Sequence, residues 1–212
     1  MNEWLDSDIA GVTRVYAKGD GPPVVVLHSW WGVDQHIRDV CGRLAEAGHR
    51  ALAPDLLGGA TPQSESQAAA AANELDLEEV VAATASLVAG LGSSSVALIG
   101  FSLGGSIALA VATQSNVVTL VVTFAGLWDS LPYAETTAAI QAHVGKLDPN
   151  VPPELRRNFL SAVEGADRAV EMHEYRHQPH GFYDHTRSEY DEAASEKAWG
   201  RTLEVLEGIL PA

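Results

Sequence analysis

The sequence predicts an α/β fold, with a mostly parallel β-sheet that has helices on both of its faces. Short, nearly continuous apolar segments alternate along the chain with amphipathic segments of helical periodicity. Continuous apolar segments are typical of strands buried on both faces, and their alternation with helices is typical of βαβ units. We find neither an internal repeat nor a linker, so residues 1–212 are expected to form a single domain.

The expected elements follow one another in a regular order. Strands are expected at 12–17, 23–28, 50–54, 96–99, 117–124, 140–144 and 169–175, and helices at 35–47, 74–91, 103–112, 152–163 and 191–208. The segment Pro23 to His28 reads Pro-Val-Val-Val-Leu-His, which is the pattern of a strand buried on both faces. Residues 55–72 show neither pattern and are expected to form a long loop, of which residues 58–72 are either a mobile cover over a site or a plain surface excursion.

Capping residues set the expected ends of two helices. Gly48 suits the C-terminal end of helix 35–47, and Cys41 lies on the apolar face of that helix. We therefore interpret Cys41 as a core residue rather than a reactive thiol. Asn73 is expected to cap helix 74–91, because the acidic residues that follow it complement the dipole at a helix N-terminus.

Composition and charge exclude several functional classes. The 212 residues are 46% hydrophobic and 19% charged, which suits a globular domain with a full core. The formal net charge of −15 disfavours binding to nucleic acid and to anionic membrane surfaces. No apolar segment approaches the ~18 residues that span a bilayer. Residues 1–11 lack the pattern of a secretory signal, and the single cysteine cannot form an internal disulfide, so we expect a cytoplasmic protein.

The motif Gly100-Phe101-Ser102-Leu103-Gly104 carries the strongest chemical signal in the chain. It directly follows the apolar segment 96–99 and directly precedes a helix-like segment. Strand, Gly-x-Ser-x-Gly and helix together are typical of a nucleophile elbow, in which small flanking residues allow a sharp turn that exposes the serine hydroxyl. The alternative is a glycine-rich phosphate loop, but the Lys-Ser/Thr ending and the spacing of a P-loop are missing.

A serine hydroxyl becomes a nucleophile when a base takes its proton, and that base needs an orienting acid. His180 is the candidate base, because it lies in a turn-rich loop between the last strand and the last helix. The alternative is that His180 is an ordinary surface histidine. Asp148, just past strand 140–144, is the candidate acid, and Asp129, which also follows a strand, is its rival. Sites of open α/β sheets lie along the edge where these strands end.

An oxyanion hole needs two backbone N–H groups that point at the developing charge. The amide of Leu103, at the start of the helix after Ser102, is one candidate, and the amide of Trp30, in the loop after strand 23–28, is the other. The candidates for the substrate pocket are Ser29, Trp31, Trp128 and Phe182. For Trp30 and Trp31, core packing is an equally compatible alternative to a place in the pocket wall.

Five motifs occur in a fixed order along the chain. They are Trp31-Gly32-Val33, Ala53-Pro54-Asp55-Leu56, Gly100-Phe101-Ser102-Leu103-Gly104-Gly105, Gly145-Lys146-Leu147-Asp148 and His180-Gly181-Phe182. From about Pro23 to the last helix the chain thereby resembles the dienelactone hydrolase family. The resemblance implies a compact α/β-hydrolase without a large cap domain, which acts on esters and lactones with a triad of Ser102, Asp148 and His180.

Three positions depart from the pattern of that family. The type enzymes have a cysteine nucleophile where Ser102 stands, and a glutamate that controls their thiol where Ser29 stands. They hold an anionic lactone with arginines, one of them in the neighbourhood of Asp184, and Arg187 is the alternative cation here. No Lys or Arg occurs from residue 51 to residue 145. A neutral or weakly polar ester therefore suits this charge pattern better than a carboxylate.

A second motif, His173-Glu174-Tyr175-Arg176-His177, matches the H-E-x-x-H signature of zinc proteases. The signature needs a helix, whereas this segment is expected to be a strand, on which the two histidines would lie roughly 13 Å apart. We therefore predict a serine hydrolase that cleaves a small carboxylic ester or lactone through an acyl-serine intermediate, without a metal or organic cofactor. A non-catalytic binding protein on a hydrolase scaffold is the alternative, and a metalloprotease is the weaker one.

Overall fold

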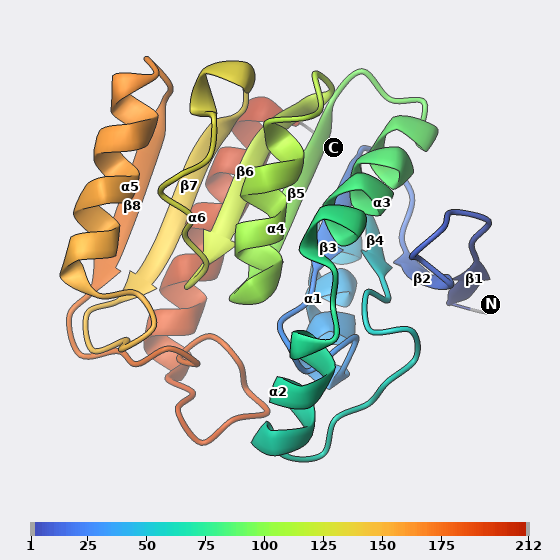
Figure 1. The fold of residues 1–212 in the computed structure, drawn as a ribbon, viewed down its shortest axis with the longest axis horizontal. Coiled ribbons are helices and arrows are strands. Elements are labelled where there is room, and N and C mark those ends of the chain that lie inside the picture. Colours follow the sequence, from blue (N-terminus) through green and yellow to red (C-terminus); the bar gives the residue numbers. More distant parts are fainter. Residues whose placement is uncertain (1–2, 211–212) are drawn as a thin grey trace.

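The computed structural model describes residues 3–210 and contains one eight-stranded sheet with helices on both faces (Figure 1). The strands are β1 (Trp4–Asp6), β2 (Arg14–Lys18), β3 (Pro23–Leu27), β4 (Arg50–Pro54), β5 (Val96–Phe101), β6 (Val118–Phe124), β7 (Ala139–Gly145) and β8 (Val170–Tyr175). Their order is β1-β2-β4-β3-β5-β6-β7-β8. β3 to β8 pair in parallel, whereas β2 is antiparallel to both β1 and β4. The mostly parallel sheet that the sequence predicts is confirmed.

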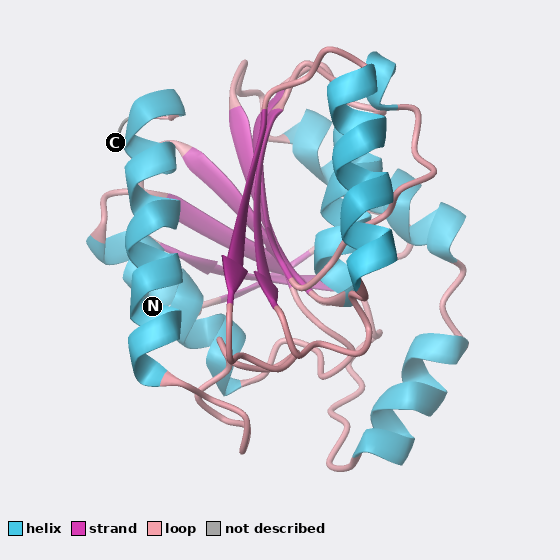
Figure 2. Cartoon of the chain, turned by 90° about the vertical axis from the view of Figure 1, so that its left-hand side faces the viewer, coloured by secondary structure: helices cyan, strands magenta, loops and turns pink. Residues whose placement is uncertain are grey.

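The helices divide into two layers (Figure 2). They are α1 (Gln35–Glu46), α2 (Glu65–Asn73), α3 (Leu77–Gly90), α4 (Leu103–Ala112), α5 (Pro153–Gly165) and α6 (Glu192–Ile209), with a short 3₁₀ helix η1 (Tyr133–Glu135). The apolar side chains of α1 and α6 pack on one face of the sheet, and those of α3, α4 and α5 pack on the other. None of the helices within residues 3–210 has the length and apolar character needed to cross a membrane.

The central strand β5 shows how the sequence pattern produces the two cores. All of its residues are buried. Val96 and Leu98 belong to the core beneath α3 and α4, whereas Ala97, Ile99 and Phe101 belong to the core beneath α1 and α6. Successive strand residues point to opposite faces, so a strand covered on both sides must be apolar throughout. Complete burial of an aliphatic side chain such as Leu98 stabilises the fold by about 1.5–3 kcal/mol.

The expected strands and helices are confirmed to within a few residues at their ends, but the region between β4 and α3 differs. Residues 55–72 are not wholly a loop, because they include most of α2, which begins after the capping side chain of Ser64. Asn73 ends α2 instead of capping the next helix. The cap of α3 is Asp76, whose carboxylate accepts hydrogen bonds from the amides of Glu78 and Glu79. The edge strand β1 was also not expected from the sequence.

The C-terminal ends of the parallel strands lie along one edge of the sheet, and the predicted site residues lie at that edge. Ser102 follows β5, Asp148 follows β7 and His180 follows β8. The loop that contains Trp30 follows β3, which is the neighbour of β5. Residues far apart in the sequence are thus brought to a common rim by the order of the strands.

Candidate active site

Ser102 occupies a strained turn between β5 and α4. Its backbone angles are φ 51° and ψ −114°, a conformation that residues other than glycine seldom adopt. The crowding around the turn explains the neighbouring glycines. A Cβ atom on Gly100 would lie 2.3 Å from the carbonyl oxygen of Gly104, and one on Gly104 would lie 2.2 Å from that of Leu27. The Ser102 amide donates to the Phe124 carbonyl at 2.7 Å, which ties the turn to β6.

Ser102, His180 and Asp148 form a continuous chain of hydrogen bonds. Nδ1 of His180 lies 2.7 Å from Oδ2 of Asp148, and Nε2 lies 2.7 Å from Oγ of Ser102. A carboxylate only accepts hydrogen bonds, so Nδ1 carries the proton and Nε2 is left to accept the serine hydroxyl. The Asp148 side chain is fully buried, whereas 27% of the His180 side chain is exposed. This is the arrangement in which an imidazole can receive a proton from a hydroxyl.

The loops that carry the acid and the base support each other. The amide of Leu147 donates to the carbonyl of Gln178 at 3.0 Å, and Asp148 accepts the amide of Asn150 at 2.8 Å with its other oxygen. A Cβ atom on Gly145 would lie 2.2 Å from the Gln178 carbonyl oxygen, so only glycine allows the two loops to approach so closely. Among the residues described, Nδ1 of His180 donates to Asp148, and no hydrogen bond joins the rival Asp129 to this ring.

The two predicted oxyanion donors lie on the wall of the pocket beside Ser102. Trp30 and Leu103 both line this pocket, and within residues 3–210 no protein acceptor binds either backbone amide. His28 holds the loop of Trp30. Its Nδ1 donates to the Ser29 carbonyl at 2.6 Å, and its Nε2 accepts the Leu56 amide at 3.0 Å.

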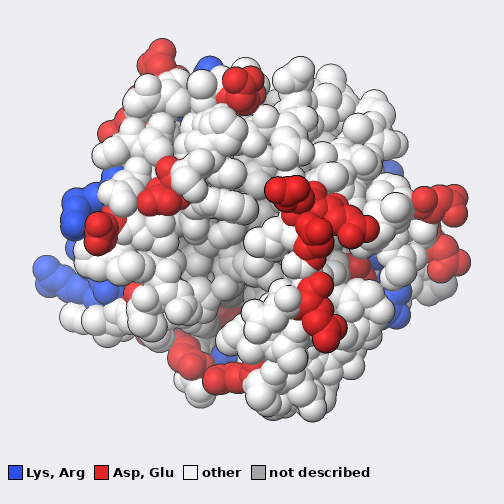
Figure 3. All heavy atoms as spheres, viewed as in Figure 1, with Lys and Arg blue, Asp and Glu red and all other residues white. Residues whose placement is uncertain are grey.

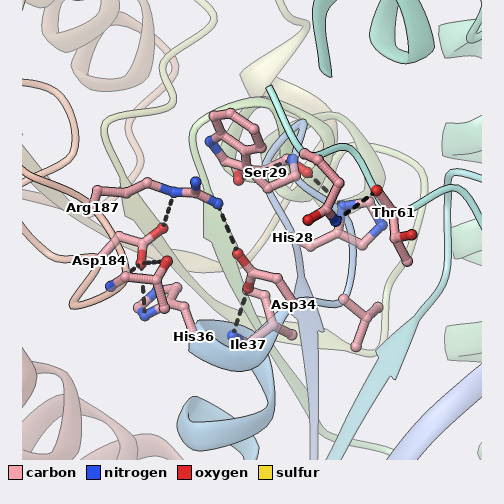
Figure 4. Close-up of polar contacts among 12 residues, drawn as sticks. His28, Ser29, Asp34, His36, Ile37, Thr61, Asp184 and Arg187 are labelled. Atoms are coloured by element: carbon pink, nitrogen blue, oxygen red, sulfur yellow. Dashed lines mark hydrogen bonds and ion pairs between the residues drawn. The ribbon is translucent and has the colours of Figure 1, made fainter. Parts of the chain in front are cut away.

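Burial lowers the pKa of His28, which keeps the ring neutral and able to make both contacts. His28 is the last residue of the strand that the sequence predicts at 23–28, but its role as a link between the loops after β3 and β4 was not foreseen. Figure 4 shows the His28 ring between these two loops.

The pocket at Ser102 has a volume of about 350 Å³, and its walls combine apolar and uncharged polar residues with His180. Its lining residues are Trp30, Ser102, Leu103, Ser106, Ala125, Gly126, Leu127, Asn150, Val151 and His180. No Lys, Arg, Asp or Glu occurs in this set of described residues. The loop 125–127 after β6 and the segment 150–151 were missed in the sequence, because nothing in their composition marks them as pocket walls.

The four residues expected to line the pocket lie outside this set. Phe182 is completely buried in the core and packs against Tyr175, with 4.9 Å between ring centroids. The Trp31 ring lies beneath a guanidinium group, and the Ser29 hydroxyl accepts the amide of Trp31 at 3.4 Å. The indole of Trp128 donates to a neighbouring serine hydroxyl at 3.0 Å. The prediction that Phe182 lines the pocket is therefore wrong, because its ring is part of the core.

Arg187, the alternative cation for a substrate carboxylate, is engaged by protein carboxylates. Its Nη2 donates to Asp34 at 3.1 Å and its Nε donates to Asp184 at 3.3 Å (Figure 4). Asp184 also belongs, with His36 and His185, to a group whose side chains lie close enough to hold a metal ion. However, Thr186 and Arg187 already occupy the two oxygens of Asp184. This group therefore has the chemistry of an ion-pair network.

The zinc-protease signature at 173–177 does not form a helix. His173 lies in β8, which ends at Tyr175, as the sequence predicted. Of the residues described, His173 and His177 do not form part of any group with metal-binding spacing. His173 instead stacks on the buried ring of His143, with 5.2 Å between the ring centroids. The motif therefore contributes to packing between β7 and β8.

The chain is similar to several known proteins over nearly its whole length. A protein of Bradyrhizobium sp., named "probable 2-oxo-3-(5-oxofuran-2-ylidene)propanoate lactonase", is 29% identical, over 95% of this chain and 92% of its own. A carboxymethylenebutenolidase of Pseudomonas sp. is 30% identical, over 100% of this chain and 97% of its own. The crystal structure of a dienelactone hydrolase-like promiscuous phosphotriesterase from metagenomic libraries superposes with a TM-score of 0.83 at 21% identity, over 97% of both chains.

The match to a family model is nearly complete. The model described as "Dienelactone hydrolase family" matches residues 10–210, which include every motif named above and the whole hydrogen-bonded chain from Asp148 to Ser102. The chain therefore belongs to the dienelactone hydrolase family.

Proposed function

We propose that this protein hydrolyses small carboxylic esters or lactones through an acyl-serine intermediate. The observation that carries the proposal is the hydrogen-bonded chain from Asp148 through His180 to Ser102, with 2.7 Å at both steps. The named activities of the relatives, a lactonase and a carboxymethylenebutenolidase, are of the same reaction class. We further propose that the chain is a single hydrolase domain that works in the cytoplasm, since its one cysteine is buried and unpaired.

The first half of the reaction forms the acyl-enzyme. Oγ of Ser102 attacks the carbonyl carbon while its proton moves to Nε2 of His180. Asp148 keeps the Nδ1 proton in place and stabilises the imidazolium that forms. The amides of Leu103 and Trp30 donate to the negatively charged oxygen of the tetrahedral intermediate. The bond to the leaving oxygen then breaks, and His180 returns its proton to the departing alcohol.

The second half regenerates the enzyme. A water molecule gives a proton to Nε2 of His180 as its oxygen attacks the acyl carbon, and the Ser102 oxygen leaves and takes the proton back. With a lactone, the alcohol that leaves in the first half remains joined to the acyl group. The product is then one hydroxy acid instead of an acid and an alcohol.

The charge distribution favours an uncharged substrate. The described lining of the pocket contains no Lys or Arg, and the nearby Arg187 already pairs with two carboxylates. Acidic side chains also gather over α3 on the face shown in Figure 3, where cationic side chains are sparse. An anionic substrate would therefore be repelled on approach and find no free cation in the pocket.

A panel of p-nitrophenyl esters with graded acyl chains, together with neutral and anionic lactones, tests the proposal. The pocket of about 350 Å³ predicts a preference for short acyl chains. Neutral substrates should have a higher kcat/KM than anionic ones of equal size. Ser102→Ala and His180→Ala should each lower kcat by several orders of magnitude, on the scale of about 10⁶ where such residues act as a unit. Activity that survives both substitutions would contradict the proposal.

A further inference from the structure

Two loops of the site meet at Arg187 (Figure 4). The oxyanion loop, residues 29–34, follows β3 and contains Trp30. The base loop, residues 176–191, follows β8 and contains His180. Arg187 belongs to the base loop, but its Nη2 donates to Asp34 of the oxyanion loop at 3.1 Å. Its guanidinium carbon also lies 3.7 Å from the centre of the Trp31 ring, within the range of a cation–π contact.

Both carboxylates that Arg187 contacts are largely buried and take part in local structure. Asp34 uses its second oxygen to cap α1 through the amide of Ile37. Asp184 uses its second oxygen to accept the amide and hydroxyl of Thr186. Burial raises the pKa of Asp34 and the charge of Asp184 raises it further, whereas Arg187 and the Ile37 amide lower it. Without the guanidinium, two desolvated negative charges on different loops would face each other.

A short path of contacts joins Arg187 to each half of the catalytic machinery. Toward the oxyanion, the Trp31 ring packs edge-on against the ring of Trp30, with 5.9 Å between centroids. Toward the base, the Arg187 amide donates to the Asp184 carbonyl, and the Asp184 amide donates to the carbonyl of Gly181, the residue after His180. Arg187 is therefore linked to the Trp30 donor through Trp31, and to the base His180 through Asp184 and Gly181.

We infer that Arg187 is a positioning residue that fixes the oxyanion loop relative to the base loop. The inference rests on the proposed function. In this role Arg187 does not touch the substrate. It sets the place of the Trp30 amide relative to Nε2 of His180 through the Asp34 ion pair and the Trp31 stack. Arginine suits this role because its planar group can stack on an indole and donate to two carboxylates at once, which lysine cannot do in the same way.

The test compares Arg187→Met with a matched control, Arg43→Met. Arg43 has the same kind of contacts away from the site: it donates to both oxygens of Glu196 at 2.8 and 2.7 Å and lies 4.5 Å over the Trp199 ring. Arg187→Met should lower kcat for a neutral ester by about 10- to 100-fold, because a displacement of about 1 Å at a catalytic group can cost 10²-fold. KM should change less than about threefold, and Arg43→Met should leave both constants unchanged.

Binding of a transition-state analogue distinguishes a positioning role of Arg187 from a merely structural one. A trifluoromethyl ketone forms a tetrahedral adduct whose oxyanion needs the two amides, so its Ki should rise by the same factor by which kcat falls. Arg187→Lys should recover part of the activity. The double variant Asp34→Asn/Arg187→Met should lose less kcat than the product of the two single losses, because both substitutions break the same contact. If Arg187→Met does not fold, Arg187→Lys and Asp34→Asn alone carry the test, because each weakens the same contact and should lower kcat and raise the Ki of the ketone together.

Three results would overturn the inference. The first is a kcat of Arg187→Met equal to that of Arg43→Met. The second is an unchanged Ki of the ketone despite a lower kcat. The third is a rise of KM confined to anionic esters such as p-nitrophenyl hemisuccinate, which would make Arg187 a substrate-binding residue. An inactive wild-type protein would instead refute the proposed function, so the two failures can be told apart.

Discussion

The protein should lose stability in mild acid, because the fold keeps a histidine neutral in its core. His143 on β7 is completely buried and stacks on Phe124, with 4.7 Å between ring centroids. Its Nε2 donates to the Gln141 side-chain oxygen at 2.9 Å, and its Nδ1 accepts the Tyr175 hydroxyl at 2.9 Å. Burial lowers the pKa of His143 from 6.5 to about 3, helped by the nearby His173. Protonation would remove the acceptor at Nδ1 and place a charge in the core.

The size of the effect follows from linkage between proton binding and folding. Between pH 6.5 and about 3 the unfolded chain binds a proton at His143 and the folded chain does not. The free energy of unfolding therefore falls as the pH falls through this window. At pH 5, which is 1.5 units below the ordinary pKa, the loss from this one group is about 2 kcal/mol relative to pH 8. His36, whose pKa burial lowers to about 4, should contribute a similar loss.

Urea unfolding of the wild type at pH 8 and pH 5, followed by tryptophan fluorescence, measures the loss. His143→Gln can still donate and accept in the same place but does not titrate. Its loss between the two pH values should be smaller than that of the wild type by about 2 kcal/mol. His177→Gln is the matched control, because His177 is exposed, and it should behave as the wild type does. Equal losses in His143→Gln and the wild type would refute the reasoning.

Two further predictions concern the active site. Asp148→Asn should lower kcat by about 10⁴-fold, because the imidazole would lose its orienting carboxylate, whereas Asp129→Asn should leave kcat unchanged. The reverse result in steady-state assays would show that Asp129 is the acid. Gly104→Ala should abolish activity and lower the melting temperature, because the new Cβ meets the backbone of β3. Gly90→Ala, with open space around its Cβ, should not destabilise the protein, and a calorimetric scan of both variants decides.

The order of elements and the residues of the hydrogen-bonded chain could be predicted from the sequence because both have strong local signals. Buried strands such as β5 are apolar throughout, and the Gly-x-Ser-x-Gly pattern at Ser102 stands directly between a strand and a helix. His180 and Asp148 follow predicted strands of a parallel sheet, so topology brings them to the same rim. Topology alone did not decide between Asp148 and Asp129, because both follow strands; the hydrogen bond from His180 to Asp148 appears only in the structure.

The features that could not be predicted depend on tertiary contacts or on weak local differences. The segment 65–73 is rich in alanine, which suits a helix, but it has no amphipathic pattern, and only Ala68 is buried. Asp76 and not Asn73 caps α3. The two residues lie three positions apart and have similar side chains, so the sequence pattern does not distinguish them as caps. The pocket wall at 125–127 consists of small residues without a motif. The place of Arg187 depends in part on Asp34, which lies 153 residues away in the sequence.

The central claim is that Ser102 is a nucleophile activated by His180. Treatment with a fluorophosphonate probe, followed by mass spectrometry of the digested protein, tests it most directly. We expect one labelled peptide, with the probe on Ser102, no labelling of Ser102→Ala, and labelling of His180→Ala slowed by orders of magnitude. An unlabelled wild-type Ser102, or a Ser102→Ala variant that hydrolyses esters as fast as the wild type, would contradict the account.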